Sequence, residues 1–461
     1  MAPDDAHPGD FFDEAEQDAF FLAEGGRKMD CQEEFSTLLH ADDGVAFLVH
    51  LARECTGHYA WIDSTLHYRH MYPRAVQLSM TKRRRGVRLL EVSNVDAMMG
   101  RVDDVRLAIR EALRAPGTKL VVLASSCIAE ITGMQLRDVL EQESEAASVP
   151  AVFLELTVDE NTPMEQFWSQ VMRLARTDVA PEPRSVVLVG FGEQGSPLAA
   201  EARGVLERCG VRLRGVLLPS FDSGTAERFC EASLAAVNSA EAVVREFGLA
   251  RRRLEPHVRF AELDPPFGPT GTRRFYRRLV AACGGGRPGA AVAAYWAPLA
   301  EAWERARRRA AEHAAAVIVA SEDVEYLTQP RRLYGIDLVG LLREMGFRVR
   351  VVCTARRPSD RAADLAVSLR RSLEARRGPD DGLEVVSCGG GSLRETLRAA
   401  GDAALVFTEY PPDRRITGTG RLPFHPRDFE PGFEGALRTL VRLTRLAESR
   451  FHASCRSAEL S

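Results

Sequence analysis

The sequence predicts an α/β protein with three Rossmann-like, doubly wound parallel-sheet domains. Short apolar runs alternate with helical stretches along most of the chain, and most of these runs lack the alternation of a half-exposed strand. Continuous apolar runs are typical of parallel strands that helices cover on both faces. The length of 461 residues also corresponds to about three domains of ~100 to 200 residues each.

The predicted strands begin with the strand-like stretch Val45–His50 and continue to the C-terminal part of the chain. The others are Val87–Val92, Lys119–Ala124, Ala151–Leu156, Ser185–Gly190, Val211–Leu218, Ala315–Ala320, Phe347–Cys353, Leu383–Ser387 and Ala403–Thr408. A helix is predicted over Val102–Arg114, where Val102, Val105, Leu107 and Ile109 follow a helical period in part and Pro116-Gly117 ends it. Another helix begins at Thr162-Pro163, the start of a T-x-x-E capping box. Repeated strand, helix and strand predict doubly wound domains.

Changes in composition suggest where these domains begin and end. Thr177–Arg184 and the Gly/Pro-rich stretch Gly284–Gly289 read as boundaries. We therefore expect an N-terminal arm over 1–40, Rossmann-like domains over 41–180 and 181–285, a linking helix over 286–314, and a third Rossmann-like domain with a C-terminal helix over 315–461.

The charge balance excludes some classes of partner. The chain has 61 Lys+Arg against 65 Asp+Glu, which gives no general case for binding nucleic acid or an anionic membrane surface. No apolar run approaches the ~20 residues that span a bilayer, and the N-terminus is acidic where a signal peptide is basic. We expect a cytoplasmic protein without nucleic-acid or membrane partners.

The nine cysteines are the residues most able to carry chemistry. In a reducing compartment they are metal ligands, reactive thiols or buried side chains. Cys127 follows the predicted strand at a strand-to-helix turn, where helix N–H groups favour a thiolate and where doubly wound sheets bind ligands. Its alternative is a small buried side chain at the sheet edge. Cys55 follows the first predicted strand, and Cys31 precedes it.

The remaining six cysteines are expected to be bystanders. They are Cys209, Cys230, Cys283, Cys353, Cys388 and Cys455. A zinc site is an alternative for the N-terminal region, because His50, Cys55, His58, His67 and His70 lie within 21 residues. Their spacing matches no standard zinc finger.

Cys31, Cys55 and Cys127 together resemble the ligand set of the nitrogenase component 1 family, which includes nitrogenase, the protochlorophyllide and chlorophyllide reductases, and methylthio-alkane reductase. The spacings are 24 and 72 residues, the second somewhat longer than usual in the family. Val49-His50 through Cys55-Thr-Gly-His-Tyr59 resembles the family element I-H-G-x-x-G-C-x-x-Y. Ser125-Ser-Cys-Ile-Ala-Glu-Ile-Thr-Gly133 is similar to T-T-C-M-A-E-V-I-G of the β-subunit.

Further elements of the family occur in the same order. Gln77–Thr81 resembles S-S-S-M-T, and Leu234–Asn238 with Phe247-Gly248 resembles A-x-x-N followed by Y-G. Pro265–Thr270 resembles P-x-G-x-x-T, and Gly432-Phe-Glu-Gly435-Ala resembles G-Y-E-G-A. Their shared order over residues 31–440 supports the assignment.

The resemblance implies three Rossmann-like domains and an iron–sulfur cluster, of the [4Fe-4S] or the [8Fe-7S] P-cluster type, at an interface between paired subunits. Cys31, Cys55 and Cys127 would hold it together with thiolates of a homologous α-type subunit in a heterodimer or heterotetramer, with Ser125, Ser126 and Tyr59 as candidate supporting residues. A separate ATP-hydrolysing iron–sulfur reductase protein would supply electrons. No residue is singled out as catalytic.

Some positions depart from the family pattern. Glu54 stands where glycine is usual before the second cysteine, and Ala242-Val-Val244 lacks the cysteine that ligates the α-subunit's active-site cofactor, which favours a β-type role. His425 lies near the Gly432 element, and we expect it to be a surface residue or to contact a substrate in preference to ligating a metal. The substrate stays open between methylthio-alkane, dinitrogen-like and tetrapyrrole compounds. A non-catalytic scaffold for cofactor assembly is the alternative function.

Overall fold

The computed structural model describes residues 44–52, 87–92, 95, 99–126, 132–156, 163–192, 194–218, 221–320, 324–354, 362–377, 382–389, 393–407 and 414–449. These residues form two compact units, 44–264 with 274–292 and 265–273 with 293–449. Every strand pairing recorded within the three sheets is parallel, which confirms the predicted α/β class with three parallel sheets. The boundaries expected between sequence domains stay predictions.

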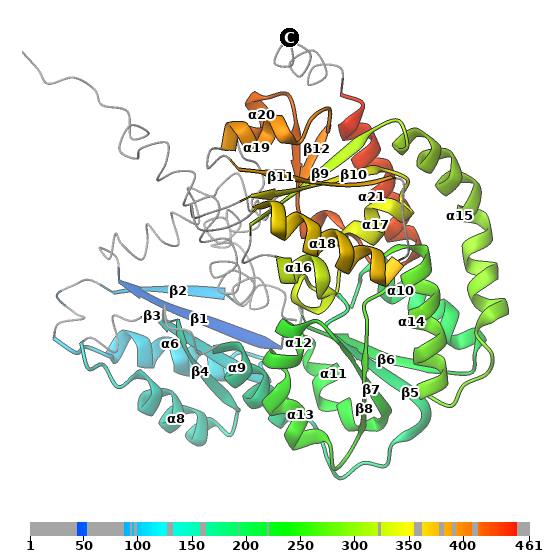
Figure 1. Ribbon diagram of the computed structural model, residues 1–461. Helices are drawn as coiled ribbons and strands as arrows, with labels where there is room; N and C mark the ends of the chain where they lie inside the picture. The colour runs from blue at the N-terminus through cyan, green and yellow to red at the C-terminus, as the bar shows by residue number, and fades with distance from the viewer. Residues whose placement is uncertain are drawn as a thin grey trace, which may run out of the picture. The chain divides into compact units, whose positions relative to one another are not determined.

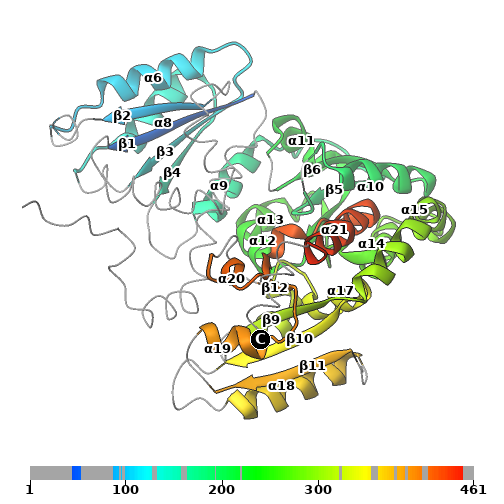
Figure 2. The same ribbon diagram turned by 90° about the horizontal axis from the view of Figure 1, so that it is seen from above.

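The first sheet has the strand order β2-β1-β3-β4 (Figure 1). Its strands β1 to β4 are Val45–Ala52, Val87–Val92, Leu120–Ser126 and Ala151–Leu156. Helices α6 (Asp103–Arg114) and α8 (Leu136–Ala147) share one apolar core with Val121 and Leu123, so they cover one face (Figure 2).

The opposite face of the first sheet belongs to a second core. There Leu120 and Val122 join α9 (Pro163–Val171), which the 3-10 turn Met172–Leu174 follows. Adjacent residues of β3 thus enter different cores because successive side chains of a strand point to opposite faces. Helices on both faces explain why the strand is a continuous apolar run from Leu120 to Ala124.

The second sheet lies in the same compact unit and has the order β6-β5-β7-β8. Strands β5 to β8 are Glu182–Val189, Arg212–Leu217, Ala232–Asn238 and Arg259–Leu263. The helical segments of this region are α10 (Pro197–Arg208), α11 (Ser223–Glu227), a 3-10 turn (Phe229–Glu231), α12 (Glu241–Glu246), α13 (Gly248–Leu254) and α14 (Gly268–Ala282). Trp168 of α9 is fully buried with ring centroids 5.9 Å from both Phe221 and Phe247, so α9 shares its core with the second sheet.

The third sheet forms the core of the other unit, with the order β11-β10-β9-β12-β13. Strands β9 to β13 are Ala314–Ala320, Arg348–Thr354, Leu383–Cys388, Leu405–Phe407 and Leu422–Phe424. Its helical segments are α15 (Gly289–Ala310), α16 (Val324–Thr328), a 3-10 turn (Pro330–Arg332), α17 (Leu338–Glu344), α18 (Ala362–Arg377), α19 (Leu393–Ala399), α20 (Arg414–Gly418), a 3-10 turn (Pro426–Asp428) and α21 (Gly432–Ala447). Ala315 and Val317 face one core while Ala314 and Ala316 face another, so this sheet is also covered on both faces.

The structure corrects some of the sequence expectations. It adds β7, β8 and β13, which were not predicted as strands. Leu107 was expected in the apolar register of its helix but is 53% exposed, whereas Val105 and Ile109 are buried. Ala108 is buried in its place, so the apolar stripe of α6 consists of Val105, Ala108, Ile109 and Leu113, at the spacing of one helix face.

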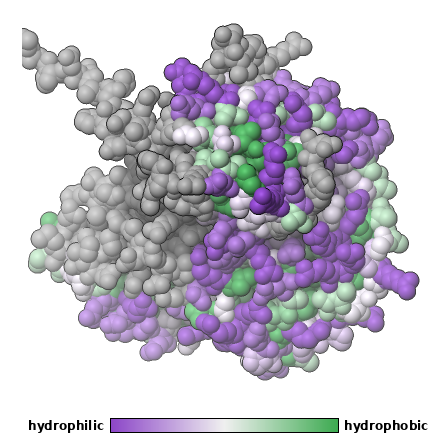
Figure 3. Space-filling view, in the orientation of Figure 1, coloured by the Kyte–Doolittle hydropathy of each residue, from purple (hydrophilic) through white to green (hydrophobic). Residues whose placement is uncertain are grey.

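Polar residues cover most of the described surface in the view of Figure 3. Among the described helices, none combines the length and the apolar character needed to cross a bilayer.

Candidate functional site

The first sheet has a topological switch point, or reversal, between the neighbouring parallel strands β1 and β3, where the chain connections run outward in opposite directions. From β1 the chain passes outward to β2, and from β3 it passes outward on the other side to β4. Ligands of open α/β sheets bind beyond the carboxyl ends of the strands at such a reversal. In this register His50 of β1 lies opposite Ser125 of β3, near the carboxyl end of each strand.

The predicted ligands follow these two strands in the chain. Cys127 is the next residue after Ser126, which ends β3, and Cys55 comes three residues after Ala52, which ends β1. Cys31, Cys55, Cys127 and Tyr59 lie outside the described residues, as does the side chain of Ser126. Ser125 is the predicted supporting residue whose side chain is described.

His50 and Ser125, which we call the carboxyl-end pair, are almost completely buried, with exposed fractions of 0% and 1%. Nδ1 of His50 lies 3.1 Å from Oγ of Ser125 in a hydrogen bond, and Nε2 has no hydrogen-bond partner among the described residues. Burial lowers the pKa of His50 from 6.5 to about 4, so the imidazole is neutral at pH 7. Sequence reasoning considered His50 only as part of the alternative zinc site, not beside the predicted cluster. Its position near the end of an apolar strand was the available signal.

The other described cysteines behave as core residues. Cys209, Cys230, Cys283 and Cys353 are buried, and burial raises the pKa of each thiol, to about 11 for Cys283 and Cys353. Cys388 is buried as well. Iron is bound by thiolates, and the raised pKa values keep the thiols of Cys209, Cys230, Cys283 and Cys353 protonated at neutral pH. Their surroundings agree with the prediction that they are bystanders. The predicted bystander Cys455 lies outside the described residues.

The carboxyl end of β1 and β3 fits a thiolate-held group in its chemistry. The floor beneath the carboxyl-end pair is apolar, formed by Leu48, Val121 and Leu123, and these side chains exclude water. An unpartnered imidazole nitrogen is present in this dry layer. Among the described residues, no group of three or more His, Cys, Asp and Glu side chains gathers to hold a metal.

The second sheet has a corresponding reversal between β5 and β7, where side-chain hydrogen bonds link the two strand ends. Asn238 Nδ2 donates a 2.7 Å hydrogen bond to the carbonyl of Gly190, and its Oδ1 accepts one of 2.9 Å from the backbone N–H of Ala240. Gly190 has φ +82°, and a Cβ there would overlap Val243. Asn238, a residue of the A-x-x-N element, therefore joins two strand ends.

The two C-terminal family elements meet in the other unit. The backbone N–H of Gly432 donates a 2.8 Å hydrogen bond to the carbonyl of Pro266. Glu344 Oε1 accepts a 2.8 Å hydrogen bond from the N–H of Thr270 at the start of α14, and a Cβ on Gly268 would overlap this carboxylate. These elements are therefore packing positions within the unit.

His425 follows β13 and is mostly buried. Its backbone N–H donates a 2.9 Å hydrogen bond to Asp428 Oδ2, and its Nε2 lies 3.8 Å from the same oxygen. The pair closes the turn before α21. A contact between His425 and substrate stays a prediction.

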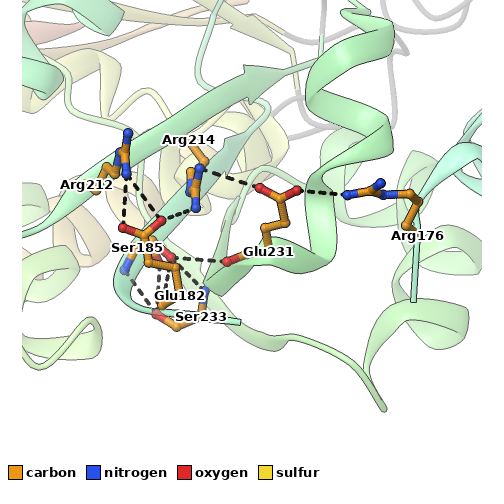
Figure 4. Close-up of polar contacts among 7 residues, drawn as sticks. All are labelled: Arg176, Glu182, Ser185, Arg212, Arg214, Glu231 and Ser233. Carbon is orange, nitrogen blue, oxygen red and sulfur yellow. Dashed lines mark hydrogen bonds and ion pairs between the residues drawn. The ribbon is translucent and has the colours of Figure 1, made fainter. Parts of the chain in front are cut away.

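A dense group of charged residues lies at the amino end of the second sheet, the end away from Asn238 and the reversal (Figure 4). Glu182 pairs with Arg212 at 3.2 Å and with Arg214, and Glu231 pairs with Arg176 at 3.3 Å and with Arg214 at 3.5 Å. We call these five residues the arginine–glutamate network. Ligands of doubly wound sheets bind at the carboxyl ends, so this network is structural.

Ser185 of β5 and Ser233 of β7 lie next to this network (Figure 4). The pairing of β5 with β7 shifts register between Glu182 and Val186, and Arg184 has φ +54° within this interval. Ser185 and Ser233 exchange hydrogen bonds there: each hydroxyl accepts from the other's backbone N–H, at 3.0 and 3.1 Å. The hydroxyls replace ladder bonds that the bulge interrupts.

Comparison with known proteins gives one family and one fold. The family described as nitrogenase component 1 type oxidoreductase matches residues 40–446. The solved structure "Nitrogenase Cp1 at pH 5" is similar with a TM-score of 0.63 at 14% identity, over 94% of this chain and 90% of that one. "Nitrogenase Cp1 at pH 6.5" is similar with a TM-score of 0.57 at 12% identity, over 91% of this chain and 92% of that one. No match was found among curated proteins.

Proposed function

The chain belongs to the nitrogenase component 1 type oxidoreductase family, and we propose that it is a subunit of a nitrogenase-like, ATP-dependent two-component reductase. In this proposal Cys31, Cys55 and Cys127 hold an iron–sulfur cluster together with a partner subunit. The cluster relays low-potential electrons to a methylthio-alkane, dinitrogen-like or tetrapyrrole substrate.

The strand order of the first sheet is the observation that carries the proposal. Neighbouring parallel strands lie about 4.8 Å apart, and β1 and β3 are neighbours. Cys127 directly follows β3, and three residues of chain span at most about 11 Å between the end of β1 and Cys55. Covalent geometry therefore allows both thiolates to reach one group beyond the sheet reversal. For Cys31 the support is the family resemblance.

The donor set agrees with the chemistry of the group. Soft thiolates suit iron–sulfur clusters, and three thiolates do not complete the usual four, so a second chain is required. When bound, such a cluster supplies one-electron redox chemistry. The described residues contribute the dry floor of Leu48, Val121 and Leu123 and the hydrogen-bonding pair above it.

The proposed partners are a homologous α-type subunit and an ATP-dependent iron–sulfur reductase protein. The position that carries a cofactor cysteine in the α-subunit pattern falls here in α12 (Glu241–Glu246), whose Val243 is 9% exposed and packs against Gly190. An apolar packing residue at this place supports a β-type subunit.

The test is electron delivery to the complex of this chain with its partner subunit, purified anaerobically. We expect the reductase protein and ATP to change the EPR signal of the cluster, and omission of ATP to abolish the change. A complex that gives its cluster to a second apoprotein and accepts no ATP-dependent electrons would instead be an assembly scaffold, which contradicts the proposal.

A further inference from the structure

His50 is a buried polar residue that the proposed cluster ligation does not use. It lies two residues before the end of β1, and its hydrogen-bond partner Ser125 lies one residue before the end of β3. Because Leu48 on the same strand face belongs to the apolar core with α6 and α8, the imidazole occupies the first polar layer above that core.

Only one of the two imidazole nitrogens has a described hydrogen-bond partner. Nδ1 bonds to Ser125 Oγ, whereas Nε2 is buried and has none among the described residues. Buried polar atoms in folded proteins are nearly always paired, so an unpartnered one calls for an explanation. Desolvation is the cause of the lowered pKa of this imidazole, which agrees with its complete burial.

A ligand at the sheet reversal explains the unpartnered nitrogen. Thiolates and cluster sulfides carry negative charge, and in a dry site this charge needs hydrogen-bond donors. When the Ser125 hydroxyl donates to Nδ1, the proton of a neutral imidazole is on Nε2. The residue then offers a donor in the layer below the strand ends and adds no net charge.

We propose that His50 is a positioning residue for the cluster site: Ser125 orients its neutral imidazole, and Nε2–H donates a hydrogen bond to a cluster sulfide or a ligand thiolate. This inference rests on the proposed function. Such a donor stabilises the reduced, more negative cluster, so it raises the reduction potential.

The experiment compares His50→Leu, His50→Gln and Ser125→Ala in the complex with the partner subunit. Iron and sulfide are measured first, and the midpoint potential is then determined by an EPR-monitored titration. We expect all three variants to keep iron, His50→Leu and Ser125→Ala to have lower potentials, and His50→Gln to recover part of the shift because its amide still donates. His257→Leu, at an exposed position, serves as the control and keeps the wild-type potential.

Three other outcomes would contradict the role of His50, its hydrogen-bond donation, or the proposed function. Potentials that are unchanged in iron-containing His50→Leu and Ser125→Ala would overturn the role of His50 and leave the cluster proposal intact. Loss of iron in His50→Leu, together with ¹⁴N hyperfine coupling in the wild type, would show direct ligation and overturn hydrogen-bond donation. Wild-type protein without iron would overturn the proposed function, and this inference with it.

Discussion

The carboxyl end of the first sheet and the amino end of the second sheet hold their polar groups in different ways: the first buries a hydrogen-bonded pair, whereas the second keeps partly exposed charges in ion pairs. In the arginine–glutamate network, each charged side chain lies against an opposite charge. In the carboxyl-end pair, His50 has one hydrogen bond, a second nitrogen without a described partner, and a pKa lowered by burial.

We infer that the arginine–glutamate network serves stability and that the carboxyl-end pair serves function. The charges of the network are paired within the chain and connect strand ends, although Arg214 Nε is, like Nε2 of His50, buried without a hydrogen-bond partner among the described residues. An unpartnered nitrogen alone therefore does not mark a site; His50 differs because no described opposite charge faces it and because it lies near the carboxyl ends of β1 and β3, where doubly wound sheets bind ligands. The predictions below test whether the two regions differ in this way.

The largest expected effect on stability is a pH dependence that comes from His50. Its pKa is about 4 in the folded chain against 6.5 in the unfolded one, so the unfolded chain binds a proton between these pH values that the folded chain does not. The contribution is fully present above pH 6.5 and falls by about 3 kcal/mol as the pH drops to 4. Urea unfolding at pH 7.5 and pH 5 measures it.

His50→Gln should remove about 2 kcal/mol of the loss in stability between pH 7.5 and pH 5. His257→Gln, at an exposed position, is the matched control and should lose stability as the wild type does. Equal pH dependence in the wild type and His50→Gln would mean that the imidazole is not held neutral in the folded chain.

A smaller loss is expected from Ser185→Ala at the bulge of β5. The change removes the acceptor for the Ser233 N–H at a fully buried position, which costs about 1–3 kcal/mol. Ser372→Ala in α18 removes an exposed 3.0 Å hydroxyl-to-carbonyl bond within a helix and should change stability by less than about 0.5 kcal/mol. If denaturant unfolding gives the same change for both variants, the serine exchange does not stabilise the bulge.

The smallest effect is expected within the arginine–glutamate network. Glu231→Gln removes the charge that faces Arg176 and Arg214, and the part-buried setting gives a loss of about 1 kcal/mol. Added salt should reduce this difference from the wild type because it screens charge pairs. Glu301→Gln, whose glutamate is 85% exposed beside Arg305, should cost less than about 0.5 kcal/mol. A salt-independent loss in Glu231→Gln would indicate a packing effect instead.

The fold class could be predicted because apolar burial on both faces leaves a clear pattern. Val87–Val92 and Ala151–Leu156 are strands with the predicted limits. Strand β7 was missed because its sequence, Ala232–Asn238, is rich in alanine, which favours helices, and only its place between β5 and β8 makes it a strand. Strand β13 has three residues and contains Pro423, so its sequence alone does not indicate pairing.

The site could be predicted less fully than the fold. Strand ends and thiol chemistry selected Cys55 and Cys127, and Ser125 was added with the cluster that the family resemblance implies. Burial and the unpartnered nitrogen of His50 depend on strand order and helix packing, which the sequence does not state. The assignments of Cys31, Cys55 and Cys127 as ligands, and of Ser125, Ser126 and Tyr59 as supporting residues, stay predictions.

Iron and acid-labile sulfide analysis, with EPR, of the anaerobically purified complex tests the central claim most directly. Cys127→Ala is compared with Cys353→Ala, a thiol of β10 that is fully buried. We predict that Cys127→Ala loses the cluster iron and its EPR signal, and that Cys353→Ala keeps both. Wild-type iron content in Cys127→Ala would contradict the assignment of a cluster to the carboxyl end of the first sheet.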